Sequence, residues 1–219
     1  MIATGAYGLL CMSYILLDET IPLFLKLDKA FGGLSFGSSD IGFLLSLSGV
    51  FMVFFTSIAL PLLASMKKSR LFLISTCFAI PVVFAWPSIA VLNRTVLDKW
   101  GLHGDRLLWL LLGSCATLKN IFACCAFTAV MIQVNDSCSH KHLGAVNGLG
   151  QSLGALARAV GPAIGGLLWS ISLHTNFIFT NFLGCAVLLV ICQCLNYQLP
   201  DPTNNRNGEE NEEIVFNEC

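Results

Sequence analysis

The sequence contains little charge. Lysine, arginine, aspartate and glutamate together make up 11% of its 219 residues, whereas a soluble domain carries about a quarter. Hydrophobic residues make up 55%, and the mean hydropathy is +0.75. This composition excludes an ordinary soluble fold and predicts an integral membrane protein surrounded by lipid. The net charge of −1 lacks the basic excess that nucleic-acid binding requires, so no nucleic-acid partner is expected.

Sequence signatures of enzymes and of bound cofactors are also absent. The sequence has no Walker motif, Gly-rich dinucleotide loop or zincin helix. No histidine lies inside the apolar stretches, where it could activate a serine for hydrolysis. His140 and His142 stand in a polar segment without a further ligand nearby, which predicts solvated side chains and no metal site. We therefore expect no catalytic residue, no cofactor and no metal.

The ten cysteines do not form a disulfide pattern. No Cys-x-x-Cys pair occurs, and most of the cysteines lie in apolar stretches, unlike the spaced cysteines of small secreted domains. We interpret them as small buried hydrophobic side chains.

Six apolar stretches are long enough to cross a bilayer as helices, which takes about 20 residues. Together they predict an all-α fold, a polytopic six-transmembrane-helix bundle within residues 1–199. Residues 200–219 are polar and acidic and predict a disordered cytosolic tail. The predicted spans cover residues 2–25, 41–65, 71–92, 107–134, 145–170 and 177–195.

An even number of spans places both ends of the chain on one side of the membrane. The positive-inside rule does not decide which side, because the two sides carry equal numbers of lysines and arginines. Lys67, Lys68 and Arg70 form a compact cluster in a very short loop, where such charges count most. We therefore expect that loop and the tail to be cytosolic. No sorting signal stands out, so the plasma membrane and the vacuolar membrane both fit.

Four charged residues fall inside the predicted spans: Asp18, Glu19, Lys119 and Arg158. Each costs about 2.5–3.5 kcal/mol at the centre of a membrane helix, so each needs a partner or a wet cavity. One hypothesis is a polar pathway in which Asp18 or Glu19 carries a proton, while Lys119 and Arg158 hold an anionic group or tune the carboxylate. The alternative is structural, with ion pairs that fix helix register, or acidic side chains that snorkel to the interface.

Small residues recur at spacings of three and four in the fifth span. Such a spacing places them on one face of a helix, and a face of small residues lets another helix approach closely. We expect this face to be a helix-packing surface. Its residues are Gln151, Gly154, Arg158, Gly161, Pro162 and Gly165.

The motifs resemble those of the major facilitator superfamily of transporters, in particular the zinc-induced facilitators and related drug:proton antiporters. Residues 147–151 (Asn-Gly-Leu-Gly-Gln), Arg158 and residues 161–166 (Gly-Pro-Ala-Ile-Gly-Gly) are similar to the eleventh helix of that family. Residues 18–24 (Asp-Glu-Thr-Ile-Pro-Leu-Phe) are similar to its seventh helix. The match runs in order through nearly all of residues 1–199. It depends on order and spacing more than on any one motif.

The resemblance implies the C-terminal six-helix half of a major facilitator fold. It also implies that Asp18, Lys119 and Arg158 face a central cavity from the seventh, tenth and eleventh helices. Leu143 stands where the family has an arginine before Gly144, and the loop before the third span lacks the family's glycine and aspartate. Because the family works as two bundles around a midplane site, we expect this chain to be part of a longer transporter or to pair with a separate half.

The predicted function is transport of a small solute coupled to protons, by antiport or by symport. The solute would be an organic molecule, a drug-like compound or a metal chelate. The alternative is a membrane protein that does not transport and that associates with a full-length transporter through its small-residue face. A mitochondrial-type carrier also has six spans, but its Pro-x-Asp/Glu-x-x-Lys/Arg repeat is absent.

Overall fold

The computed structural model describes residues 2–63, 66–138, 142–175 and 177–198, and within them the chain is almost entirely helical. Six long helices alternate with short connections, two of which contain a 3-10 helix. The prediction of an all-α, six-helix membrane fold is confirmed. The elements are α1 (Ile2–Lys26), η1 (Lys29–Phe31), α2 (Ser38–Leu63), α3 (Lys68–Thr95), η2 (Leu97–Trp100), α4 (Leu102–Asp136), α5 (Leu143–His174) and α6 (Phe179–Tyr197).

All six long helices are long and apolar enough to cross a membrane. The shortest, α6, has 19 residues, which at about 1.5 Å per residue approaches the thickness of the hydrocarbon layer. Helix α4 begins at Leu102, before the apolar stretch expected from residue 107, because a helix continues its backbone hydrogen bonds into the interfacial region. The predicted tail, residues 200–219, lies outside the described residues. The chain is an integral, multi-pass membrane protein.

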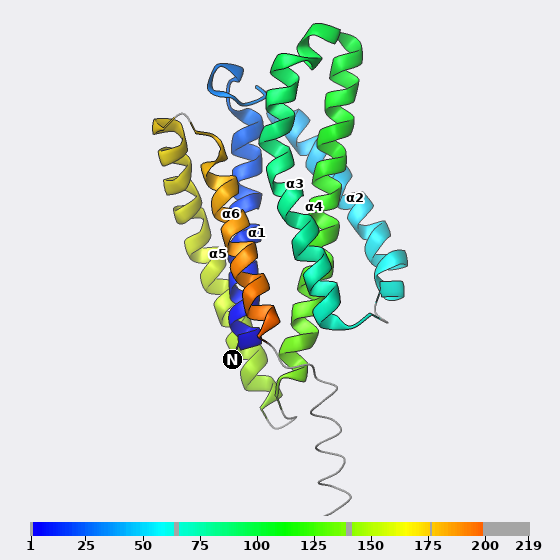
Figure 1. Cartoon of the computed structure of the whole chain (residues 1–219), viewed down its shortest axis with the longest axis vertical. Coiled ribbons are helices and arrows are strands. Elements are labelled where there is room, and N and C mark those ends of the chain that lie inside the picture. Colours follow the sequence, from blue (N-terminus) through cyan, green and yellow to red (C-terminus); the bar gives the residue numbers. More distant parts are fainter. Residues whose placement is uncertain (1, 64–65, 139–141, 176, 199–219) are drawn as a thin grey trace, which may run out of the picture.

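The helices form two interlocking groups (Figure 1). Helix α1 packs mainly against α5 and α6, and α4 packs mainly against α2 and α3. Contacts of α1 with α4, and of α3 with α6, join the groups. If α1, α2 and α3 are exchanged with α4, α5 and α6, respectively, the pattern of neighbouring helices stays the same. Because helices three apart run in opposite directions, the pattern is that of an inverted three-helix repeat, as secondary transporters use.

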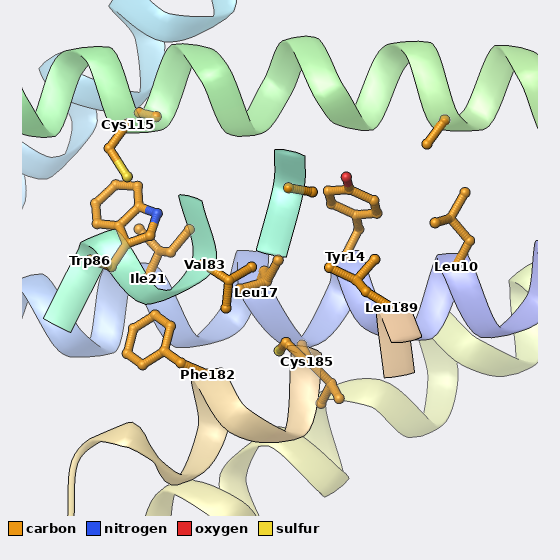
Figure 2. Close-up of a cluster of buried hydrophobic side chains, with 14 of the residues drawn as sticks. Leu10, Tyr14, Leu17, Ile21, Val83, Trp86, Cys115, Phe182, Cys185 and Leu189 are labelled. Atoms are coloured by element: carbon orange, nitrogen blue, oxygen red, sulfur yellow. The ribbon is translucent and has the colours of Figure 1, made fainter. Parts of the chain in front are cut away.

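Helix α1 lies at the centre of the bundle. In its apolar stretch 56% of the residues are buried, against 11% in α2 and 22% in α5. Since lipid is as apolar as these side chains, their packing stabilises the bundle by close contact more than by exclusion from water. Figure 2 shows Leu10, Tyr14, Leu17 and Ile21 of α1 beside Val83 and Trp86 of α3, Cys115 of α4, and Phe182, Cys185 and Leu189 of α6.

Neutral polar side chains link helices at both ends of the bundle. Gln133 of α4 donates to the amide oxygen of Asn196 in α6 at 2.9 Å. Near the opposite end, Asn181 of α6 donates to the hydroxyl of Thr20 in α1 at 3.1 Å and to the carbonyl of Gly165 in α5 at 3.3 Å. Such bonds in membranes contribute about 0.6 kcal/mol each on average. They help to set the relative positions of α1, α4, α5 and α6.

The connection between α1 and α2 is folded onto the connection between α3 and α4. Asp28 caps η1 by accepting a bond from the backbone N–H of Ala30 at 2.9 Å. Gly32 ends η1 with a left-handed backbone (φ 93°), which glycine adopts without a steric penalty. Lys29 of η1 forms an ion pair with Asp98 of η2 at 3.0 Å. This pair ties the two connections together outside the long helices.

Candidate functional site

Two of the charged residues in the spans form an ion pair between α1 and α4. The Nζ atom of Lys119 donates to Oδ1 of Asp18 at 2.5 Å. Lys119 lies at the midpoint of α4, and Asp18 lies in the second half of α1. The Lys119 side chain is 12% exposed, whereas that of Asp18 is 62% exposed. The pair therefore lies at membrane depth, with its cation enclosed and its carboxylate on the open side.

An open pocket of about 240 Å³ surrounds this ion pair. Ser48 of α2 and Asn120 of α4 supply its neutral polar groups, and they are joined by a bond from Asn120 Nδ2 to Ser48 Oγ at 3.1 Å. The Ser48 hydroxyl in turn donates to the carbonyl of Leu45 at 2.8 Å. The pocket thus combines a cation, a carboxylate, an amide and a hydroxyl from three helices. Its lining residues are Asp18, Ile21, Pro22, Leu45, Ser48, Lys119 and Asn120.

Pro22 changes the backbone of α1 at this pocket. Proline has no N–H, so residue 22 cannot donate the helical bond that the carbonyl of Asp18 would otherwise receive. Helix α1 nevertheless continues through Pro22 to Lys26, as membrane helices often do when neighbours satisfy the freed group. The spacing of Asp18 and Pro22 therefore removes the usual helical donor to the Asp18 carbonyl beside the ion pair.

Glu19 lies on a different side of α1 from Asp18. Consecutive residues of an α-helix point about 100° apart, and the Cβ of Glu19 lies 3.8 Å from where a Cβ on Gly165 of α5 would stand. Glu19 is exposed, and it takes part in no ion pair among the described residues. The structure thus brings Asp18 to Lys119 and leaves Glu19 outside the pair.

Arg158 is not part of the pocket around Lys119. It is exposed in the middle of α5, and it lies near Tyr7 and Cys11 of α1. Within the described part of the chain, no carboxylate forms an ion pair with it. A guanidinium at this depth is costly when it faces lipid. This face of α5 is therefore suited to a wet cavity or to another protein surface.

The small residues of α5 lie against α1. A Cβ added at Gly161 would stand 2.5 Å from Cγ2 of Ile15, which is closer than side chains approach without displacement. At Gly165 the added atom would lie 3.4 Å from Leu16, and at Gly154 it would lie 3.3 Å from the Tyr7 ring. All three glycines are buried, whereas Pro162, which was expected on the same packing face, is exposed. The glycines allow α5 to approach α1 closely, and that approach positions the helix that carries Asp18.

Sequence reasoning concentrated on ionisable residues and missed two neutral members of the pocket. Ser48 attracts no notice in an apolar span, because its hydroxyl can bond to a backbone carbonyl of its own helix. In the sequence, Asn120 is distinguished only by its position next to Lys119. A search for amides that share a helical face with a charge would have found Asn120, but its partner on α2 depends on how the helices assemble. Among the described residues, no three His, Cys, Asp or Glu side chains are grouped to hold a metal.

Curated relatives of the chain include two proteins that are named as transporters. It is 28% identical to a probable peptide/nitrate transporter of Arabidopsis thaliana, over 75% of this chain and 32% of the relative. It is 28% identical to the major facilitator superfamily multidrug transporter mfsB of Aspergillus fumigatus, over 94% of this chain and 34% of the relative. It is 29% identical to ZINC INDUCED FACILITATOR 1 of Arabidopsis thaliana, over 84% of this chain and 37% of the relative.

These relatives confirm the resemblance to major facilitator transporters that the sequence motifs indicated. The chain spans about a third of the length of the curated relatives it matches. No protein-family model and no solved structure matches it.

Proposed function

We propose that this chain forms one half of a secondary transporter that moves a small solute across a membrane in a proton-coupled cycle. The relatives named above are transporters, which supports membrane transport as the general activity. One observation carries the more specific proposal: the Asp18–Lys119 pair joins α1 and α4 beside an open pocket at membrane depth. In this proposal Asp18 carries the proton and Lys119 is its charge partner.

The position of the pair suits a site that changes with protonation. Helices α1 and α4 are equivalent members of the inverted repeat, and transporters place substrate and coupling-ion sites where such repeats meet. A protonated Asp18 no longer neutralises Lys119, so protonation weakens the bond between the two helices. The equilibrium between two helix arrangements then depends on whether the proton is bound. Glu19 lies one residue away and is the second candidate proton carrier.

A facing bundle completes the pathway in this proposal. The six helices supply one wall of the pocket, and Arg158 projects from a separate exposed position on α5. The partner is a second six-helix half, either on the same longer chain or on a separate one. It would enclose the pocket and place water or a carboxylate against Arg158. The solute is a small organic molecule or a metal chelate.

The test is solute flux in vesicles that contain the native protein, driven by an imposed pH gradient. Nitrate, dialanine and ethidium are suitable probes, because they cover the solute classes that the relatives' names mention. We expect gradient-driven flux of at least one probe, and we expect Asp18→Asn to abolish its dependence on the gradient. Unchanged gradient-driven flux in the variant would contradict the role of Asp18. Absence of flux for all three probes would contradict transport of these classes.

A second candidate function is supported by the exposed faces of α2 and α5. Such faces, with Arg158 exposed on one of them, would also suit a membrane protein that binds a full-length transporter without transporting anything itself. Blotting native membranes with an antibody raised to residues 204–219 separates the two proposals. A band near twice 23.7 kDa favours the transporter. A band near 23.7 kDa that co-purifies with a larger transporter favours the interaction protein.

A further inference from the structure

We infer that the solute of this site carries an anionic group, which replaces Asp18 on Lys119 while Asp18 holds the coupled proton. This inference rests on the proposed proton-coupled transport, and it specifies an anionic solute and symport with the proton. It starts from the unequal surroundings of the two partners. The Lys119 side chain is 12% exposed and that of Asp18 is 62% exposed.

The Lys119 ammonium group needs another anion when its ion pair with Asp18 is broken. Within the described part of the chain, Asp18 is the acceptor to which its ammonium group donates. The neighbouring walls of the pocket include Ile21, Pro22 and Leu45, which cannot replace the hydration of a charged group. Removing one partner from an enclosed ion pair leaves the other charge uncompensated, and that costs more than the pair contributed. A step that releases Asp18 therefore has to supply another anion.

Asp18 has no comparable need of Lys119. Its exposed carboxylate can be hydrated in a wet pocket, or a proton can neutralise it. Of the groups facing it, Lys119 on α4 is the cation, while Tyr14 on its own helix and Cys185 on α6 lie near it and offer no positive charge. Helix α2 contributes the neutral Ser48 to the pocket.

Two further charged groups near the middle of α1 lie on its α5 side. Glu19 adjoins Gly165, and Arg158 lies near Tyr7 and Cys11, about two to three helical turns before Asp18. Neither provides Lys119 with a replacement anion or Asp18 with a replacement cation. The exchange therefore concerns the Asp18 carboxylate, the Lys119 ammonium, one proton and the solute.

The charges of this exchange balance. A proton from solution converts the Asp18 carboxylate to the carboxylic acid, which leaves the Lys119 ammonium without a counter-ion. The anionic group of the solute then binds that ammonium, beside the amide of Asn120 and the hydroxyl of Ser48. One proton and one monoanion enter together, so loading adds no net charge and the coupling is symport. A cationic solute would instead compete with Lys119 for Asp18 and place two positive charges together.

The experiment uses three ring compounds of similar size: benzoate, neutral benzamide and cationic benzylammonium. Their binding is measured by the shift in thermal unfolding of the purified native protein in detergent. In the wild type, benzoate should bind more tightly at lower pH, because its binding takes up one proton at the Asp18 carboxylate. At neutral pH, Asp18→Asn should bind benzoate about tenfold more tightly than the wild type, without that pH dependence.

Two further variants make the result specific. In the double variant Asp18→Asn with Lys119→Met, the gain in benzoate affinity should disappear. Asp98→Asn removes a carboxylate from the other lysine pair, Lys29–Asp98, and should leave benzoate binding unchanged. Benzamide and benzylammonium should not gain affinity in Asp18→Asn.

Several outcomes would overturn the inference. These are tighter binding of benzylammonium than of benzoate by the wild type, no gain of benzoate affinity in Asp18→Asn, or an equal gain in the double variant. If Asp18→Asn does not fold, the pH series on the wild type decides, and benzoate affinity that does not rise on acidification contradicts the inference. Loss of gradient-driven flux in Asp18→Asn without a gain in benzoate affinity would refute this inference alone, whereas unchanged gradient-driven flux would refute the proposed function.

Discussion

The two lysine–carboxylate pairs of this chain have the same chemistry and different surroundings. Lys29 and Asp98 meet at 3.0 Å between η1 and η2, and their side chains are 47% and 40% exposed. Lys119 and Asp18 meet at 2.5 Å between α4 and α1, with exposures of 12% and 62%. The first pair is evenly solvated and joins two connections. The second is uneven, because only its cation is enclosed.

This difference decides what each pair can do. Water and salt screen an exposed pair, so it contributes about 0–1 kcal/mol and its loss is tolerated. A pair with one enclosed charge cannot lose its exposed partner unless another ion arrives. The Lys29–Asp98 pair therefore only restrains two connections, whereas the Lys119–Asp18 pair is a candidate site of anion exchange. The comparison predicts four measurable differences, in transport, in the stability of the two partners, in helix approach and in salt dependence.

The largest difference should appear in transport. Asp18→Asn removes the proposed proton carrier, and we expect the gradient-driven part of solute flux to fall by about tenfold or more. Asp98→Asn is the matched control, because it also neutralises an aspartate paired with a lysine, and it should leave flux unchanged. Both are measured in vesicles with and without an imposed pH gradient. Equal losses in the two variants would remove the distinction between the pairs.

Stability should distinguish the two partners of the enclosed pair. Asp18→Asn leaves the Lys119 ammonium uncompensated and should destabilise the protein by about 3–5 kcal/mol. Lys119→Met leaves the more exposed Asp18 carboxylate, which water in the pocket can hydrate, and it should therefore cost less than Asp18→Asn. The double variant should recover most of the loss, because it removes both charges. Unfolding in mixed micelles measures all three, and equal losses for the single variants would show that their exposures do not matter.

A third difference concerns the helix that positions Asp18. Gly161→Val places a side chain where an added Cβ already stands 2.5 Å from Ile15, so α1 and α5 must separate, at a cost of about 1–3 kcal/mol. Gly166→Val is the control, because nothing lies within 4 Å of its added Cβ. Both variants gain similar helix propensity, so their difference in unfolding free energy isolates the contact. No difference between them would show that α1 does not depend on this approach.

Much of the fold follows from the sequence, because an apolar stretch of about 20 residues permits one main structure in lipid. The depth of Asp18 and Lys119 follows from the same count. Their pairing does not, because it depends on which helices adjoin and on how each is rotated about its axis. Arg158 gives the same sequence signal as Lys119, yet the structure places it apart. Sequence reasoning can identify costly charges in a membrane, but it cannot say which of them meet.

The smallest effect should come from the exposed pair, and salt should reveal it. A double-mutant cycle with Lys29→Met and Asp98→Asn should give a coupling of about 0.2–1 kcal/mol in dilute buffer. That coupling should decline as salt is added, because both partners contact solvent. The same cycle on Asp18 and Lys119 should respond less, since mobile ions reach the enclosed ammonium poorly. If salt weakened both couplings equally, Lys119 would be as accessible to ions as Lys29, and an incoming anion would not need to displace Asp18 in order to reach it.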